Sequence, residues 1–320
     1  MSSTEKFIQM FLALAGFAVF FLILFFLISR LRGRAQDPVT AVVFVLPALV
    51  MIAFGLIYPA VLTFVQSFQN PDSTAWVGID NYTTLFSEQE YQRVLINTLI
   101  WVLLVPLMAT AIGLIYAVLV DRTRTEALSK ALVFIPMAIS MVGASIIWRF
   151  VYEYRPTNAT QIGLANQILK SLGMETYQFL LTEPWNTLFL IVVMIWIQAG
   201  FAMTVLSASI KAIPDDIIEA AKLDGVSGMQ MFRFITVPSI RPGMIVVLTT
   251  IAIGTLKVFD VVRTMTGGRF NTSVVANEFY TQAFRYDNAG LGAALAVLLF
   301  VMVTPIIVYN VRQLRKAANR

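Results

Sequence analysis

The chain has 320 residues, of which 58% are hydrophobic and only 13% are charged, and its mean hydropathy is +0.78, whereas soluble domains carry about 25% charged residues. This composition predicts an integral membrane protein, and its net charge of +5 comes from scattered bases rather than from a basic block of the kind that binds nucleic acid. The sequence contains no Cys and no His, which excludes cysteine and histidine catalysis and the usual zinc sites.

Seven apolar stretches are each close to the roughly 20 residues that a helix needs to cross a bilayer. They cover residues 7–29, 39–64, 94–120, 132–152, 188–210, 243–262 and 291–309. The first is longer than the core of a secretory signal, about 7–15 residues, and no small-residue cleavage site follows it. The sequence therefore predicts an all-α, polytopic transmembrane bundle of about seven spans. An N-terminal helix and cytoplasmic linker would occupy 1–38, and the main membrane domain would occupy 39–320.

Lysine and arginine are unevenly divided between the loops. The loops that follow the first, third, fifth and seventh stretches hold 14 of these bases, and the opposite loops hold 7. Because bases are retained on the cytoplasmic side of a membrane, the loop at 211–242 and the C-terminus are expected in the cytoplasm. Each outer loop is shorter than an independent domain of about 50 residues.

The fourth and fifth stretches supply polar and aromatic side chains near their middle. Ser140, Met141 and Ser145 lie in the fourth, and Trp196 and Gln198 lie in the fifth. Small-ligand pockets combine apolar and aromatic walls with a few polar groups, so these side chains are candidates for a translocation path. For Trp196, packing within the membrane is the alternative.

The loop after the fifth stretch predicts two short helices joined by a glycine turn. Pro214 suits a first helical turn, acids follow it near the positive end of the helix dipole, and Gly225 can close the helix in the left-handed conformation. Ser227 and Gln230 have the spacing of a capping box, which begins a second helix, and Pro238 is expected to end that helix. The two helices either rest on lipid headgroups or dock into a groove of a cytoplasmic partner.

Ionisable side chains occur in two of the apolar stretches. Lys257 and Asp260, three residues apart in the sixth, would lie on neighbouring turns of one helix and form an ion pair. Ionisable residues inside spans often mark substrate or ion pathways, and the alternative is a structural pair that steadies the span. Arg149 and Glu153, four residues apart at the outer end of the fourth stretch, are interpreted as a pair at the membrane boundary.

The loop at 211–242 also carries a motif. The segment EAAKLDG, followed after nine residues by Ile235 and then by Pro238, resembles the EAA loop of membrane subunits of ATP-binding-cassette importers. The residues that carry this resemblance are Glu219, Ala220, Ala221, Gly225, Ile235 and Pro238, with Asp224 beside the glycine and Val237 where Leu is usual. From Pro47 onward, GIDNYTTLF, FIPMAISMVGASIIWRFVY and KVFDVVRTMTGG resemble the sugar-permease branch, particularly alpha-glucoside and maltose-type permeases.

The resemblance implies a fold and a set of partners. The fold would be that of a type I importer permease, with the loop as the element that contacts the ATPase. The partners would be two copies of an ATP-binding-cassette ATPase, a second permease subunit, an extracytoplasmic sugar-binding protein and a disaccharide or oligosaccharide, in the lipid of a bacterial cytoplasmic membrane. No Gly-Lys pair of a phosphate-binding loop occurs here. ATP and Mg are therefore expected on the partner ATPase, with no cofactor and no catalytic residue on this chain.

The resemblance also implies positions for the sugar path. Alignment with the maltose-type family places its sugar-contacting regions near Met141 in the fourth stretch, Ile197 and Gln198 in the fifth, and Gly254 and Lys257 in the sixth. The alternative is that the second permease provides the sugar site.

Two other function classes are compatible with an apolar chain. An ion-coupled secondary carrier suits the seven stretches and the Lys257/Asp260 pair, but many such carriers are built from repeats, which the sequence does not show. A membrane-embedded enzyme would need a catalytic cluster, and the stretches hold no group of carboxylates for a metal. The importer hypothesis explains three features at once: the loop at 211–242, the missing nucleotide-binding motif and the short outer loops.

Overall fold

The computed structural model describes residues 3–29, 36–121 and 123–318, and most of these are helical. Within them the only β pairing is an isolated antiparallel bridge between Gln69 and Trp76. Contacts divide the chain into two compact units, Met1–Leu62 and Thr63–Arg320. The second unit contains every residue of the candidate site.

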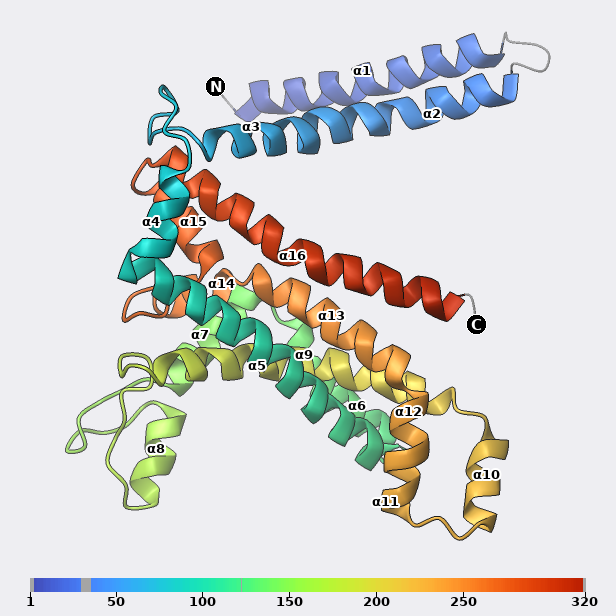
Figure 1. Ribbon diagram of the computed structural model, residues 1–320, viewed down its shortest axis with the longest axis vertical. Helices are drawn as coiled ribbons and strands as arrows, with labels where there is room; N and C mark the ends of the chain where they lie inside the picture. Colours follow the sequence, from blue (N-terminus) through green and yellow to red (C-terminus); the bar gives the residue numbers. More distant parts are fainter. Residues whose placement is uncertain (1–2, 30–35, 122, 319–320) are drawn as a thin grey trace. The chain divides into compact units, whose positions relative to one another are not determined.

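The first unit consists of apolar helices. These are α1, Ser3–Ser29, and α2, Gln36–Ile52, followed by a π-helical turn, Ala53–Ile57, and the start of α3, Tyr58–Gln66 (Figure 1). No residue of Phe44–Gln66 is buried. A helix that exposes apolar side chains on all sides is expected to face lipid or another subunit.

The second unit holds the remaining helices (Figure 1). They are α4, Asp80–Ser87; α5, Gln89–Val120; α6, Glu126–Phe134; α7, Met141–Val151; α8, Leu164–Ser171; α9, Asn186–Lys211; α10, Asp215–Leu223; α11, Gly228–Gln230; α12, Val237–Ser239; α13, Arg241–Leu256; α14, Asp260–Met265; α15, Val275–Phe284; and α16, Ala289–Ala318. A 3-10 turn, Ile135–Ala138, follows α6, and a π-helical turn, Met231–Thr236, joins α11 to α12.

The main core of this unit lies where α5 and α9 pack along each other, with α13 against both. Trp101 of α5 and Leu190 and Met203 of α9 are fully buried there. The two helices approach closely at Gly113 of α5, where a Cβ atom would lie 2.6 Å from the Cβ of Ala202. A residue without a side chain permits this approach. A smaller core joins α4, α5, α15 and α16.

The seven predicted stretches all fall on helices. Four segments are long and apolar enough to cross a membrane: Phe44–Gln66, Gln89–Val120, Asn186–Lys211 and Ala289–Gln313. Two more are bent pairs, Glu126–Ala138 with Met141–Val151 and Gly228–Ser239 with Arg241–Leu256, and the first stretch overlaps a shorter apolar segment, Phe7–Ile23. The all-α membrane fold is therefore confirmed, with four to six spans by helix length and composition.

The fourth predicted stretch is not one straight helix. The halves α6 and α7 meet at an angle of 100°. Pro136 lies in the intervening turn and has no N–H to donate. Ser140 is extended, and its Oγ accepts a 3.0 Å hydrogen bond from the N–H of Gly143. Ser140 therefore acts as an N-cap that begins a new helix inside the apolar run.

The sixth predicted stretch is also interrupted. α13 ends at Leu256, Lys257 follows as its C-cap, and α14 begins only at Asp260. No ion pair joins Lys257 to Asp260 in the part of the chain that the structure describes. The predicted pair on neighbouring turns is therefore wrong, because that spacing requires one continuous helix.

Candidate functional site

The EAA loop, residues 211–242, leaves the end of α9 and begins with α10. Gly225 follows this helix with a φ of +76°, and its N–H donates to the carbonyl oxygen of Lys222 at 3.1 Å. The N–H of Val226 donates to the carbonyl oxygen of Ala221, also at 3.1 Å. These two bonds form a Schellman motif, in which a left-handed glycine closes a helix. The predicted glycine turn is confirmed.

The second half of the EAA loop starts at the predicted capping box. Ser227 Oγ accepts from the N–H of Gln230 at 3.4 Å, and Gln230 Oε1 accepts from the N–H of Ser227 at 2.8 Å. This helix runs from Gly228 through the π-helical turn to Ser239, and the chain then bends by 66° at Ile240. The predicted end at Pro238 is confirmed to within one residue.

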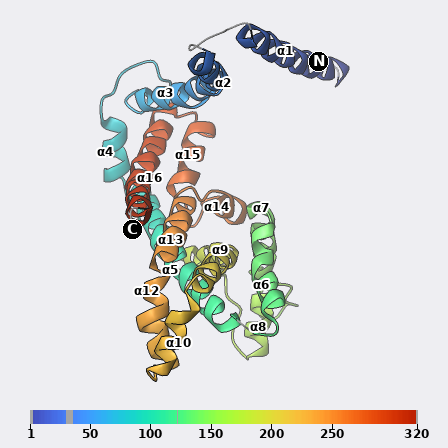
Figure 2. The ribbon, with the colours of Figure 1, turned by 90° about the vertical axis from the view of Figure 1, so that its right-hand side faces the viewer.

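Only one face of α10 packs against the rest of the unit. Ala221 is 6% exposed, and Ile218 contacts the main core. The other predicted coupling residues are Glu219, Ala220, Asp224, Gly225 and Pro238, which are exposed, and Ile235, which is half-buried. The EAA sequence is thus presented outward, on a helix whose opposite face is anchored (Figures 1 and 2).

Large apolar side chains are exposed on the same loop. Leu223 is 89% exposed, Met229 is 74% exposed and Phe234 is 67% exposed. Exposed apolar side chains among polar groups mark a surface that contacts lipid headgroups or a partner. The EAA loop has the composition of such a surface.

An ionic cluster ties α6 to the end of α9, directly before the EAA loop. Glu126 Oε1 lies 2.6 Å from Lys130 Nζ and 2.5 Å from Lys211 Nζ. Lys211 Nζ is also 4.0 Å from Asp121, the residue that follows α5, and Lys130 Nζ donates to Ser207 Oγ of α9. This cluster fixes the position from which the EAA loop starts.

The predicted path residues do not converge on a cavity. Ile197 is buried in the main core, Met141 packs against it, Gln198, Gly254 and Asp260 are half-buried, and Ser140 and Lys257 are exposed. None of them lines any of three well-defined cavities in the part of the chain that the structure describes. Trp196 is a candidate for the path or, alternatively, for packing within the membrane. Its ring makes an edge-to-face contact with the ring of Trp148, with 5.7 Å between the ring centroids.

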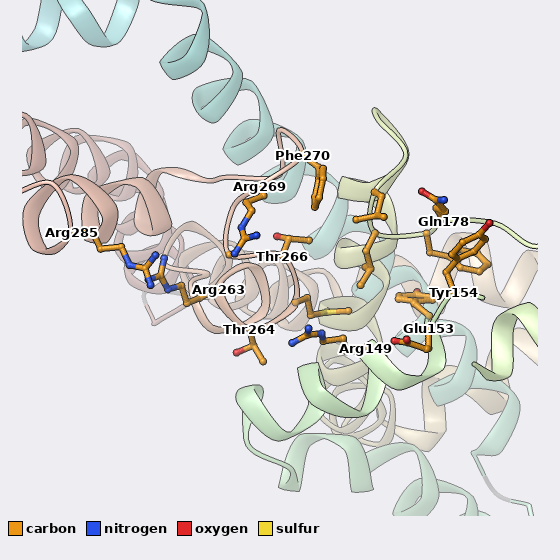
Figure 3. A pocket seen from close by; sticks show the side chains of 16 residues that line it. Arg149, Glu153, Tyr154, Gln178, Arg263, Thr264, Thr266, Arg269, Phe270 and Arg285 are labelled. Carbon is orange, nitrogen blue, oxygen red and sulfur yellow. The ribbon is translucent and has the colours of Figure 1, made fainter. Parts of the chain in front are cut away.

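A cavity of about 500 Å³ lies at the end of α9 opposite to the EAA loop (Figure 3). Four arginines line it, from α7, α14, the loop after α14 and the end of α15: Arg149, Arg263, Arg269 and Arg285. Its one carboxylate is Glu153. No ion pair joins Glu153 to these arginines among the described residues, so the predicted Arg149–Glu153 pair is not formed. The reason is that α7 ends at Val151, before the turn that the pair requires.

The loop after α14, residues 266–273, forms one wall of this cavity and is held by buried amides. Asn186 Nδ2 donates to the carbonyl oxygen of Phe270 at 2.7 Å. Asn97 Nδ2 donates to the carbonyl oxygens of Asn271 at 2.6 Å and Ser273 at 3.0 Å. Phe270 and Asn271 have φ values of +55° and +54°. Such conformations persist only where the surroundings fix them, so this loop is rigid.

The same architecture occurs in known proteins. Residues 94–316 match the family described as "Binding-protein-dependent transport system inner membrane component". This chain is a member of that family. The permease is 44% identical over 272 residues to the osmoprotective compounds uptake permease protein GgtC of Synechocystis, covering 85% of this chain and 98% of that protein. It is 41% identical over 280 residues to the alpha-glucoside transport system permease protein AglF of Rhizobium meliloti, covering 87% and 83%.

Solved structures agree with the fold. A bacterial ABC transporter involved in the import of the acidic polysaccharide alginate contains a chain that superposes with a TM-score of 0.74 at 23% identity, covering 89% of this chain and 99% of that one. At this identity the likeness shows the fold alone. The permease is therefore a membrane-spanning subunit of an ATP-binding-cassette importer, and the secondary-carrier alternative is set aside by its family membership.

Glu126 was not among the residues that the sequence singled out. Only the fold brings Glu126 to Lys211, which is 85 residues away in the sequence.

We expect Glu126→Gln to reduce the amount of solute moved per ATP hydrolysed by roughly fivefold, since a loss of about 1 kcal/mol in the free energy that positions the EAA loop corresponds to that factor. Uptake and ATP hydrolysis measured together in proteoliposomes give this ratio. Glu175→Gln removes an exposed acid far from the cluster and should leave the ratio unchanged; an unchanged ratio in both variants would refute the positioning role.

Proposed function

We propose that the permease moves an alpha-glucoside or a related disaccharide or oligosaccharide across a bacterial cytoplasmic membrane. The names of its relatives support a sugar-like solute, since one is an alpha-glucoside permease and another, 30% identical, is a trehalose/maltose permease of Thermococcus litoralis. The translocation path would be shared with a second permease subunit. Such sharing would explain why Ser140, Met141, Gln198, Lys257 and the other path candidates line none of the three cavities described above.

The observation that carries the proposal is the geometry of the EAA loop. Its helix is anchored by Ala221 and Ile218, ended by Gly225, and exposes Glu219 together with Leu223. Such a short helix is marginal in isolation, so its exposed face needs a partner. In the proposed complex that face docks on a separate ATPase subunit, present in two copies, and the remaining motif residues Ala220, Asp224, Ile235 and Pro238 shape the contact.

Energy would come from the partner ATPase, where ATP and Mg bind, because the sequence has no Gly-Lys pair of a phosphate-binding loop. The uneven division of bases supports a cytoplasmic position for the EAA loop and the C-terminus. A sugar-binding protein on the outer side would deliver the solute. Closure of the ATPases would move the EAA loops and rock the two permeases between outward-open and inward-open states.

Reconstitution tests this proposal. Proteoliposomes that contain the permease, its second permease subunit, the ATPase and the binding protein should accumulate a radiolabelled alpha-glucoside when ATP is supplied. Omission of the ATPase should abolish accumulation, and an ion gradient should not replace ATP. Accumulation by the permease alone on an ion gradient would overturn the proposed function.

A further inference from the structure

We infer that the arginine-lined cavity opposite the EAA loop receives acidic side chains of the extracytoplasmic binding protein. This inference rests on the proposed function, because it names the surface at which the binding protein docks. The cavity is lined by Arg149, Arg263, Arg269 and Arg285, against Glu153 alone. Four guanidinium groups and one carboxylate leave three positive charges without a counter-charge on the cavity wall.

The four arginines have no direct ionic partner from outside the cavity wall in the described part of the chain. No ion pair to any of the four arginines is found there. Glu183 Oε2 accepts a 2.6 Å hydrogen bond from Asn271 Nδ2, and among the described residues Glu183 forms no ion pair with these arginines. Arg263 is held in place by its contact with the ring of Tyr280, 4.6 Å from the guanidinium carbon to the ring centroid. The arginine side chains at this cavity therefore have no ionic partner among the described residues, and Arg263 and Arg285 lie beside each other (Figure 3).

The wall that presents Arg269 is preorganised for contact. The amides of Asn97 and Asn186 fix residues 266–273 from two different helices, and Arg269 and Phe270 are exposed at the rim. A rigid rim loses little conformational entropy when a partner binds. Guanidinium groups bind carboxylates with paired, planar hydrogen bonds, so aspartate and glutamate side chains fit this cavity.

Charge and position favour a binding protein over a charged solute as the source of the carboxylates. The cavity lies at the end of α9, about 39 Å from the EAA loop at 1.5 Å per helical residue, and not near the middle of the spans. A solute that met three uncompensated charges on its path would be retained, whereas transport requires weak binding. A family defined by its dependence on a binding protein must dock one on this side. Electrostatic complementarity at such a surface raises the association rate and selects the partner.

The test measures docking on the complete transporter in nanodiscs. The sugar-loaded binding protein should dock roughly tenfold more weakly on the Arg269→Gln/Arg285→Gln double variant than on the wild type, mainly through a slower association rate. Raising NaCl from about 50 to 200 mM should weaken wild-type docking and affect the double variant much less. Arg269→Lys with Arg285→Lys retains both charges and should restore most of the affinity.

The matched control is Arg155→Gln, which removes an exposed base close to the cavity but outside its wall. It should dock like the wild type, and all variants should keep the ATP hydrolysis that occurs without binding protein, which shows that they are assembled. Wild-type docking by the assembled double variant would overturn the inference, as would an equal loss in Arg155→Gln. If the binding protein does not dock on the wild type at all, the proposed function fails instead.

Discussion

Replacing Gly225 by proline should reduce ATP-driven uptake by the order of 100-fold. Gly225 has a φ of +76°, whereas proline fixes φ near −65°, and proline also lacks the N–H that Gly225 donates to Lys222. The mismatch costs about 3 kcal/mol or more, and each 1.4 kcal/mol corresponds to a factor of about ten. The Schellman motif would open, and the exposed face of α10 would no longer meet the ATPase in one orientation.

Gly228→Pro provides a matched control within the same loop. Gly228 is the first residue of α11, has no atom within 4 Å of a built Cβ and lies where proline is favoured in helices. We expect it to keep most of the uptake. Accumulation of radiolabelled sugar and ATP hydrolysis should be measured together in proteoliposomes. Both rates should be divided by the amount of inserted protein. Equal uptake by Gly225→Pro and Gly228→Pro would contradict a role for the left-handed turn in coupling.

Gly113→Ala should destabilise the permease itself. A Cβ at this position would lie 2.6 Å from both the backbone nitrogen of Met203 and the Cβ of Ala202, so α5 and α9 would have to separate. Overpacking of this kind costs about 1–3 kcal/mol. Thermal unfolding of the detergent-purified permease should show a lower midpoint, and less protein should accumulate in the membrane.

Gly254→Ala is the corresponding control. Gly254 is also inside a long helix, α13, but no atom lies within 4 Å of its built Cβ. Its unfolding midpoint should stay at the wild-type value or rise slightly, because alanine is favoured over glycine in a helix. If Gly113→Ala were as stable as Gly254→Ala, the close packing of α5 on α9 would not be an essential contact.

The EAA loop was predictable from sequence because its signals are local. Gly225, Ser227 and Gln230 each act over three to five residues, and the structure places them as their spacing predicts. The coupling role of the EAA residues stays a prediction, since it depends on a partner. The apolar stretches were likewise visible in sequence, because a span depends on the composition of its own residues.

The breaks within spans and the cavity were harder to predict for different reasons. Ser140 begins a helix inside an apolar run, and hydropathy averages over that cap. Lys257 and Asp260 were paired on the assumption of a continuous helix. The arginine cavity depends on contacts between distant segments, such as the bond from Asn97 to Asn271, which are 174 residues apart. A single sequence gives no sign of such contacts.

Helix α9 differs from the long apolar helices α2, α5 and α16 in one respect. α2, α5 and α16 each contain an interior proline, at Pro47, Pro106 and Pro305, whereas α9 has none from Asn186 to Lys211. Because its backbone hydrogen bonds are not interrupted by proline, α9 is expected to be stiff, with the arginine cavity at its N-terminal end and the EAA loop at its C-terminal end. A tilt of α9 that starts at one end should therefore move the other end as well. Docking of the binding protein at the cavity and binding of ATP to the ATPase at the EAA loop should then raise each other's affinity by the same factor, as reciprocal linkage requires.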